Sequence, residues 1–240
     1  MLVHVDIRGL EVVTAAYLSQ DPVLCDEIRS GFDFHADNQT RFNLVDRTTA
    51  KRFVFQLLYG GTAFGYTQKP DFFHVSRKQQ FWQDVIDKFY QKYSVLAKWH
   101  QSLMQEVMKN GYLVMPTGRE YHFTPMVFKG EHKWPRTKIL NYPVQGTGAD
   151  LVCIGRVTLW KRLKKTKFPI LFQSTVHDSI DLDVLDNDLE MIYNVCKIVK
   201  SSIEDIPLNF YRLFGKEFNL PVSSEIKFGH SLGALQLYDN

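Results

Sequence analysis

The chain has 240 residues, long enough for one large domain or two smaller ones, and its composition excludes an intrinsically disordered protein. Hydrophobic residues make up 45% of the sequence and charged residues 23%, which is typical of a globular protein with a buried core. The net charge of +3 permits a nucleic-acid partner but does not indicate one, because a basic surface can be hidden in a nearly neutral total.

The beginning of the chain and its cysteines indicate a soluble protein of the cytoplasm. No charged segment followed by an apolar one marks a signal peptide, and no stretch is long enough to span a bilayer. The three cysteines, Cys25, Cys153 and Cys196, are scattered, and their spacing suggests neither a zinc site nor a disulfide framework. We therefore expect a reducing compartment and no membrane partner.

The first half of the chain is predicted to be mostly helical. Apolar and polar residues alternate over residues 2–6, which predicts a strand, and helical spacing follows over residues 10–18. Asp46 is a suitable N-cap for a long helix over residues 47–59. An amphipathic, aromatic-rich pattern predicts a second helical region over residues 76–109.

Strands and helices are mixed in the second half. The pattern predicts a hairpin over residues 111–123, a loop that becomes a helix over 143–163, a strand–turn–strand over 170–184, a helix over 189–203 and a strand over 221–228. Because strands and helices do not alternate regularly, the fold class predicted from the pattern is α+β.

One face of the predicted helix over residues 47–59 combines charge with aromatic rings. Arg47, Lys51, Phe55 and Tyr59 recur every four residues, so they share a single, slowly drifting face. A nucleoside triphosphate laid along that face would meet the cations with its phosphates and the rings with its sugar and base. An ordinary amphipathic helix with core aromatics and solvated cations has the same spacing, so the pattern alone leaves both interpretations open.

The complete string RTTAKRFVFQLLYGG resembles the nucleotide-binding fingers helix of family A DNA polymerases. That helix has Arg, Lys, an aromatic residue and Tyr-Gly at intervals of four, and all of these are present here. The resemblance implies that Arg47, Lys51, Phe55 and Tyr59 bind the incoming nucleotide and that Lys51 also takes part in catalysis. Gly60-Gly61, which have no side chains, would let a template strand pass close to the backbone.

The first candidate carboxylate is Asp6, at the end of the predicted first strand. An Asp in that place can be a metal ligand, although it is more often a helix cap or a turn residue. The string DIRGLEVVTAAYLSQDP, which begins at Asp6, resembles the first catalytic motif of the same family. The resemblance implies that Asp6 and the carbonyl of Ile7 bind metal. It implies that Glu11 crowds the sugar 2′ position and so excludes ribonucleotides.

The second candidate carboxylate is Asp178, at the tip of the predicted hairpin over residues 170–184. Asp is also simply a favourable turn residue. Val176-His177-Asp178 resembles the final motif of the family, His-Asp-Glu, with Ser179 in the third position. The resemblance implies that Asp178 is the second metal-binding carboxylate and that His177 contacts DNA.

Two further segments resemble parts of the family that contact DNA. NYPVQGTGAD, from Asn141, is similar to the family's NxPxQGTxAD segment, and the resemblance implies that Asn141 and Gln145 donate hydrogen bonds to the minor groove. Thr117-Gly118-Arg119 is similar to its TxxGR hairpin, in which the Arg approaches DNA. A polar loop and a solvated Arg are the ordinary alternatives.

A third segment points to the nucleotide. Asp33-Phe34-His35 is similar to a segment of phage-type members whose His contacts the incoming phosphates. On its own, His35 would be expected at the surface or at a helix cap. If the chain is encoded by a phage, its compartment is the cytoplasm of the host.

The resemblance extends from residue 1 to the C-terminus and implies a specific architecture. We expect a polymerase palm, an antiparallel sheet with helices, formed by residues 1–32 and 139–240. Residues 33–138 are expected to form helical fingers. No segment resembles the thumb or the exonuclease domain of the family. Loss of the upstream palm strands would leave an open sheet edge, so we expect an upstream polymerase chain that carries the thumb and possibly the exonuclease.

The implied activity is that of a DNA-directed DNA polymerase. Such an enzyme adds dNTPs to a primer 3′-hydroxyl on a primer–template, and it uses two Mg²⁺ ions bound to Asp6, Ile7 and Asp178. Two alternatives remain. A single-subunit RNA polymerase shares the His-Asp-Ser motif, although Glu11 argues against it. A primer–template-binding fragment without catalysis is the other, although the intact Asp6, Lys51 and Asp178 argue against it.

Overall fold

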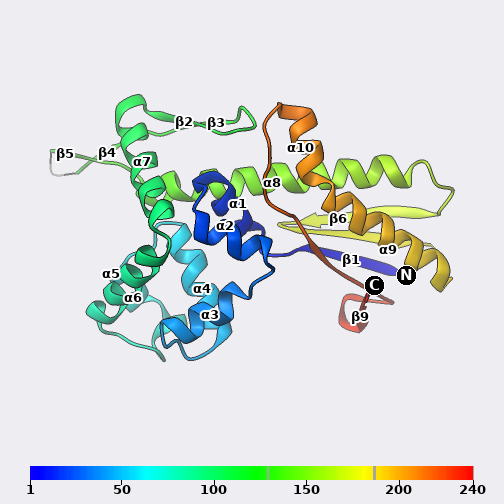
Figure 1. The fold of residues 1–240 in the computed structure, drawn as a ribbon, viewed down its shortest axis with the longest axis horizontal. Helices are drawn as coiled ribbons and strands as arrows, with labels where there is room; N and C mark the ends of the chain where they lie inside the picture. The colour runs from blue at the N-terminus through cyan, green and yellow to red at the C-terminus, as the bar shows by residue number, and fades with distance from the viewer. Residues whose placement is uncertain (129, 186–187, 240) are drawn as a thin grey trace. The chain divides into compact units, whose positions relative to one another are not determined.

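A computed structural model describes residues 1–128, 130–185 and 188–239, and the chain divides into two compact units (Figure 1). The sheet unit joins Met1–Leu10 to the chain from Gly146 onward, and the helical unit is Glu11–Gln145. Helix α8 (Arg136–Leu163) contains the division between the two. The palm and fingers boundaries expected near residues 32 and 138 stay a prediction, since compactness alone assigns no function to either unit.

The sheet unit is built on a five-stranded antiparallel sheet with the strand order β6-β7-β1-β8-β9. The strands are β1 (Leu2–Ile7), β6 (Ile170–Val176), β7 (Ser179–Val184), β8 (Ser224–Gly229) and β9 (Leu235–Leu237). The first strand of the sequence therefore lies at the centre of the sheet, between two strands from the last third of the chain.

The two faces of this sheet differ in polarity. In β1, Val3, Val5 and Ile7 are buried, whereas the alternate residues are only partly buried. Helix α9 (Leu189–Glu204) packs against β1 and β8. Because successive side chains of a strand point to opposite faces, the partly buried face of β1 is the one that presents Asp6.

Helix α8 approaches the junction between α9 and α10 (Ile206–Phe214) closely. A Cβ atom at Gly155 would lie 2.9 Å from Cδ1 of Ile203 and 3.0 Å from Cδ1 of Ile206. A larger residue at position 155 would require these two side-chain ends to shift, so the absence of a side chain at Gly155 allows α8 its close approach to this junction inside the sheet unit.

The helical unit consists mainly of seven helices. They are α1 (Leu10–Ser19), α2 (Pro22–Arg29), α3 (Phe34–Arg41), α4 (Arg47–Leu58), α5 (Ala63–Gln68), α6 (Gln79–Lys92) and α7 (Ser94–Asn110). Four of them begin at a side-chain cap that accepts a backbone hydrogen bond, namely Asp21, Asp33, Asp46 and Thr62. Such caps satisfy backbone N–H groups that have no partner inside the helix.

Aromatic side chains form the core around α4. Phe53 stacks on Trp82 of α6 with ring centroids 6.0 Å apart, and Tyr66 of α5 stacks on the same indole at 5.0 Å. The Tyr66 hydroxyl donates a 2.9 Å hydrogen bond to the carbonyl oxygen of Phe53. All three rings are buried, so they fix which face of α4 remains at the surface.

Two short hairpins follow α7: β2 (Tyr112–Val114) with β3 (Glu120–His122), and β4 (Met126–Phe128) with β5 (Glu131–Lys133). Val107 of α7, Leu113 of β2 and Ile139 and Leu140 of α8 are buried in one hydrophobic cluster. This cluster joins the β2–β3 hairpin to the helices of its own unit.

Most elements predicted from the sequence are confirmed. The strands and helices expected over residues 2–6, 10–18, 47–59, 111–123, 170–184, 189–203 and 221–228 are all present, within one to three residues at their ends. The mixed helix and antiparallel sheet confirm the predicted α+β class. Helices α2, α3, α5 and α10, the β4–β5 hairpin and strand β9 were not predicted.

The helical region predicted over residues 76–109 is present as two helices, α6 and α7, which meet at Tyr93, where ψ is 65°. One prediction needs correction. The loop expected at Pro143 lies inside α8. Pro143 lacks the N–H that would reach the carbonyl of Ile139, but burial of the apolar residues around it, Leu140 and Val144 among them, offsets that loss.

Within the part of the chain that the structure describes, no helix is both long enough and apolar enough to cross a membrane.

Candidate active site

The predicted nucleotide-binding stripe, Arg47, Lys51, Phe55 and Tyr59, lies on the surface side of α4. Arg47 and Lys51 are exposed and the two rings are half-buried. The Lys51 ammonium lies 5.4 Å from the centroid of the Phe55 ring. The aromatic residue of α4 that is fully buried in the core of the helical unit is Phe53, which is not part of the stripe. The stripe is therefore not the core face of an amphipathic helix.

The C-terminal end of α4 brings together two residues predicted for different roles. Gln145 donates a 2.6 Å hydrogen bond from Nε2 to the hydroxyl of Tyr59.

The two glycines that follow Tyr59 each have a role in the fold. Gly61 is tightly packed, since a Cβ atom there would lie 2.7 Å from the Gln56 carbonyl oxygen. Gly60 has a φ of 82° and ends the helix. Both glycines thus have a structural reason to be there, apart from any template strand.

The N-terminal end of α4 carries an ion pair that the sequence did not predict. The Arg47 guanidinium donates from Nε to both carboxylate oxygens of Asp33, at 3.3 and 3.1 Å, and from Nη2 to Oδ1 at 3.2 Å. Asp33 also caps α3, by accepting a 3.0 Å hydrogen bond from the amide of Ala36. The hydrogen bond from Arg47 is the main cause that lowers the pKa of Asp33.

His35 lies beside this ion pair and beside the stripe. Its ring meets Phe55 edge-on with centroids 5.7 Å apart. Its Nδ1 atom is buried and has no hydrogen-bond partner among the described residues. Burial, followed by the charges of Arg47 and Lys51, lowers the pKa of His35 to about 4. His35 is therefore neutral at pH 7 and lies next to two cations.

In the sheet unit, the two predicted carboxylates lie on neighbouring strands. Asp6 of β1 is directly opposite Ser179 of β7, the residue after Asp178. The backbone N–H of Ile7 donates a 3.1 Å hydrogen bond to the carbonyl oxygen of Asp178. Residues separated by more than 170 positions in the chain thus meet at one end of the sheet.

The turn that holds Asp178 contains only two residues. Val176 pairs with Ser179 across the hairpin, and the exposed His177 between them has a φ of 53°. Short hairpin turns require such left-handed residues, and His adopts them more readily than most. The Ser179 hydroxyl closes the turn with a 2.9 Å hydrogen bond to the Val176 carbonyl.

A third carboxylate, which sequence reasoning missed, flanks Asp6 on its other side. Glu225 of β8 is directly opposite Asp6. Its carboxylate pairs with Lys227 at 2.5 Å and with Arg8 at 3.9 Å, and the hydrogen bond from Lys227 lowers the pKa of Glu225. The only sequence signal for Glu225 was that it lies near the start of the strand predicted over residues 221–228.

The donors at this end of the sheet suit a hard divalent cation. Carboxylate and carbonyl oxygens are the ligands of Mg²⁺, which commonly binds through one or two protein carboxylates, substrate phosphates and water. In the described parts of the chain, no three His, Cys, Asp or Glu side chains are grouped as a complete metal site. By donor type, Asp6, Asp178 and the Ile7 carbonyl are the groups at this end of the sheet that could hold such an ion.

The remaining predicted residues occupy helix and hairpin surfaces. Glu11 is in the first turn of α1, where a carboxylate also favours the helix dipole. Asn141 and Gln145 are one helical turn apart on α8, half-buried and exposed respectively. The exposed Arg119 begins the return of the β2–β3 hairpin, after Gly118 with a φ of 83°.

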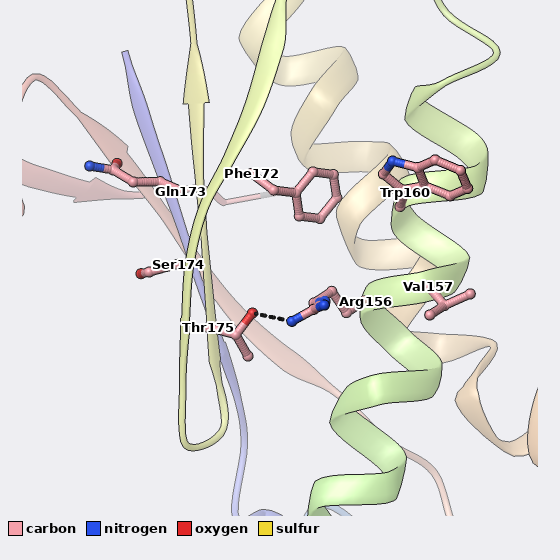
Figure 2. Close-up of a pocket in the computed structure, with 7 residues that line it drawn as sticks. All are labelled: Arg156, Val157, Trp160, Phe172, Gln173, Ser174 and Thr175. Atoms are coloured by element: carbon pink, nitrogen blue, oxygen red, sulfur yellow. Dashed lines mark hydrogen bonds between the residues drawn. The ribbon is translucent and has the colours of Figure 1, made fainter.

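A groove of about 490 Å³ runs between α8 and the outer strand β6 of the sheet unit. Figure 2 shows Phe172 of β6 pointing towards α8, and Ser174 pointing away from it. Arg156 donates a 3.4 Å hydrogen bond to Thr175, and the half-exposed Val157 and Trp160 complete the α8 wall. None of the residues predicted for catalysis lines this groove.

The fold is that of a polymerase domain. A solved structure, described as "POL domain of Pol1 from M. smegmatis complex with DNA primer-template and dNTP", superimposes with a TM-score of 0.78 at 17% identity. The match covers 96% of this chain and 39% of the solved one.

The sequence profile of DNA polymerase family A matches residues 1–234, and the chain belongs to that family. It is 26% identical over 213 residues to the thermostable DNA polymerase I of Thermus aquaticus, and 24% identical over 246 residues to the DNA polymerase of Bacillus phage SP01. These matches cover 85% and 97% of this chain, which spans about a quarter of the length of either relative.

Proposed function

We propose that the chain is the catalytic portion of a DNA-directed DNA polymerase, which adds dNTPs to a primer 3′-hydroxyl as a template directs. Membership in DNA polymerase family A supports this proposal. The structural observation that carries it is the pairing of β1 with β7, because this pairing brings Asp6 next to the hairpin tip that holds Asp178.

In this proposal the α4 stripe binds the incoming nucleotide. Arg47 and Lys51 neutralise the triphosphate, and Lys51 also protonates the leaving pyrophosphate. The half-buried rings of Phe55 and Tyr59 meet the sugar and base, and His35 contacts the phosphates. Glu11 excludes ribonucleotides by occupying the space of the 2′-hydroxyl. The exposed, cation-rich surface of α4 supports this assignment.

Asp6, Asp178 and the Ile7 carbonyl would hold two Mg²⁺ ions, which activate the primer hydroxyl and stabilise charge on the phosphates. The choice of oxygen donors supports Mg²⁺ over softer metals.

The proposal assigns the DNA contacts to four residues on the surface. Asn141 and Gln145 share a face of α8 one turn apart, a spacing suited to adjacent minor-groove acceptors, which every base pair offers. His177 at the hairpin tip and Arg119 in the β2–β3 hairpin are both exposed, and they would contact the strands.

We propose further that polymerisation requires an upstream polymerase segment that carries a thumb. Two observations support this. The chain spans 39% of the related polymerase domain. Among the described residues, β6 pairs only with β7, and the groove beside it, of mixed polar and apolar lining, is open to solvent. An edge strand next to exposed Val157 and Trp160 is a favourable place for further chain to pack.

A primer-extension assay tests both proposals. The purified chain is supplied with primer–template, Mg²⁺ and either dNTPs or NTPs, with and without an upstream polymerase polypeptide. We expect extension with dNTPs, stimulated by the added polypeptide and abolished by EDTA. Extension with NTPs instead would favour an RNA polymerase. Binding of primer–template without Mg²⁺-dependent extension, even with the partner added, would favour a non-catalytic DNA-binding role.

A further inference from the structure

We infer that Asp33 is a counter-ion for Arg47 within the chain itself. The triphosphate of an incoming nucleotide must displace Asp33 from Arg47 before it can bind there. Asp33 therefore raises the concentration of nucleotide that the site requires. The inference rests on the proposed nucleotide-binding role of α4. It concerns a residue to which the family resemblance gave no role.

The geometry of the pair is that of a bound anion. Two N–H groups of the Arg47 guanidinium reach both carboxylate oxygens of Asp33, at 3.1 to 3.3 Å. Guanidinium binds carboxylate and phosphate in the same forked arrangement. The Asp33 carboxylate consequently occupies the N–H groups of Arg47 that would otherwise donate to phosphate oxygens.

The Asp33 carboxylate also makes a second contact, on α3. Asp33 caps α3 through the amide of Ala36 at 3.0 Å. This cap holds Asp33 through a contact that does not involve Arg47. Both side chains of the pair are about half-exposed, but the Arg47 side chain is the longer and has more rotatable bonds, so it is the partner that can move away. We expect Arg47 to move to the nucleotide and Asp33 to stay behind at the start of α3, because its hydrogen bond from the Ala36 amide does not depend on Arg47.

The surroundings favour a more strongly charged anion than Asp33. Lys51 is exposed on the same face of α4, one turn beyond Arg47. Nδ1 of His35 is buried and has no hydrogen-bond partner within the described parts of the chain, and burial together with the charges of these two cations lowers the pKa of the ring. One carboxylate balances one of the two cations. A triphosphate would balance both and offer an acceptor to His35, so the exchange is favourable once nucleotide is present.

A substitution that removes only the charge tests the inference. Asp33→Asn keeps the helix cap, since Asn and Asp are equally good N-caps. Exposed ion pairs are weak, so we expect the KM for dNTP to fall roughly two- to five-fold with little change in kcat. In an Arg47→Ala background, Asp33→Asn should have no further effect on KM. An unchanged KM, or a raised one that marks Asp33 as a residue positioning Arg47, would overturn the inference.

The matched control is Asp26→Asn, which removes an exposed carboxylate from its 2.9 Å pair with Arg29 on α2 of the same unit. This control should leave the KM unchanged. Equilibrium binding of inorganic tripolyphosphate, which needs neither metal nor primer, separates the two hypotheses. If the chain fails to extend primers but Asp33→Asn still tightens tripolyphosphate binding, the proposed function is wrong and the counter-ion stands. If tripolyphosphate binds no tighter to Asp33→Asn, the counter-ion is wrong whatever the chain polymerises.

Discussion

Gln145 of α8 donates a hydrogen bond to the hydroxyl of Tyr59 at the end of α4, with a donor–acceptor distance of 2.6 Å. The two residues were predicted separately, one for the minor groove and one for the incoming nucleotide. Their contact means that neither side chain is free to respond to a ligand without affecting the other.

Replacing Tyr59 with Phe removes the acceptor and keeps the ring. We expect the free energy of unfolding to fall by about 0.5–1 kcal/mol, as for the loss of one hydrogen bond, and extension from mismatched primer ends to increase. Urea unfolding and a mismatch-extension assay measure these effects. The exposed Tyr112→Phe in the same unit is the control and should change neither. Wild-type mismatch extension in Tyr59→Phe would show that the contact has no part in pair discrimination.

Asp6→Ala and Asp178→Ala should each reduce primer extension to background while primer–template binding is retained. The reason is that each removes a proposed metal ligand. Filter binding and gel-based extension report the two properties separately. The control is Asp183→Ala. Asp183 lies on β7 opposite Leu2, at the other end of the strand pair from Asp6, so this variant should extend primers normally. A wild-type rate for either of the first two variants would refute the metal assignment.

Glu11→Ala should increase incorporation of ribonucleotides by roughly tenfold or more, equivalent to about 1.4 kcal/mol of lost discrimination. A steric role predicts that Glu11→Gln, which keeps the volume, behaves like the wild type. The exposed Glu106→Ala on α7 controls for loss of charge in the helical unit. Competition between dNTP and NTP in single-nucleotide extension gives the ratio. If the Gln and Ala variants lose discrimination equally, charge and not bulk is responsible.

Acid should destabilise the helical unit through His100. Its ring is buried on α7, with Nδ1 3.0 Å from the Tyr90 hydroxyl, and burial lowers its pKa from 6.5 to about 3. Between those pH values the unfolded chain binds the extra proton, so stability is fully present above pH 6.5 and falls as the pH drops towards 3. The slope from one such group is at most about 1.4 kcal/mol per pH unit.

His100→Asn should therefore weaken the dependence of Tm on pH between 7 and 4, whereas the exposed His122→Asn should not. Thermal unfolding at a series of pH values measures this. Parallel curves for His100→Asn and the wild type would assign the acid sensitivity to other groups.

Local patterns predicted most of the regular structure because their causes are local. Asp46 and the four-residue spacing after it are sufficient to define α4, and alternation is sufficient for β1 and β7. The helical course of α8 through Pro143 was not predictable in this way, since it depends on burial of residues around the proline.

The candidate site was predictable only in part, for the same reason. The residues of the α4 stripe lie together because one helix holds them. The pairing of Arg47 with Asp33, and the position of Glu225 opposite Asp6, arise from contacts between elements distant in sequence. No spacing rule within a single chain contains that information.

The central position of β1 has a consequence for how the protein assembles. Its hydrogen-bonding partners β7 and β8 begin at Ser179 and Ser224, so β1 cannot pair on both sides until the chain has been synthesised through Gly229. Contacts of such long sequence separation form slowly, because the loop entropy must be lost before they are made. Truncating only the six residues of β1 would split the sheet into two hairpins and remove Asp6 in the same step.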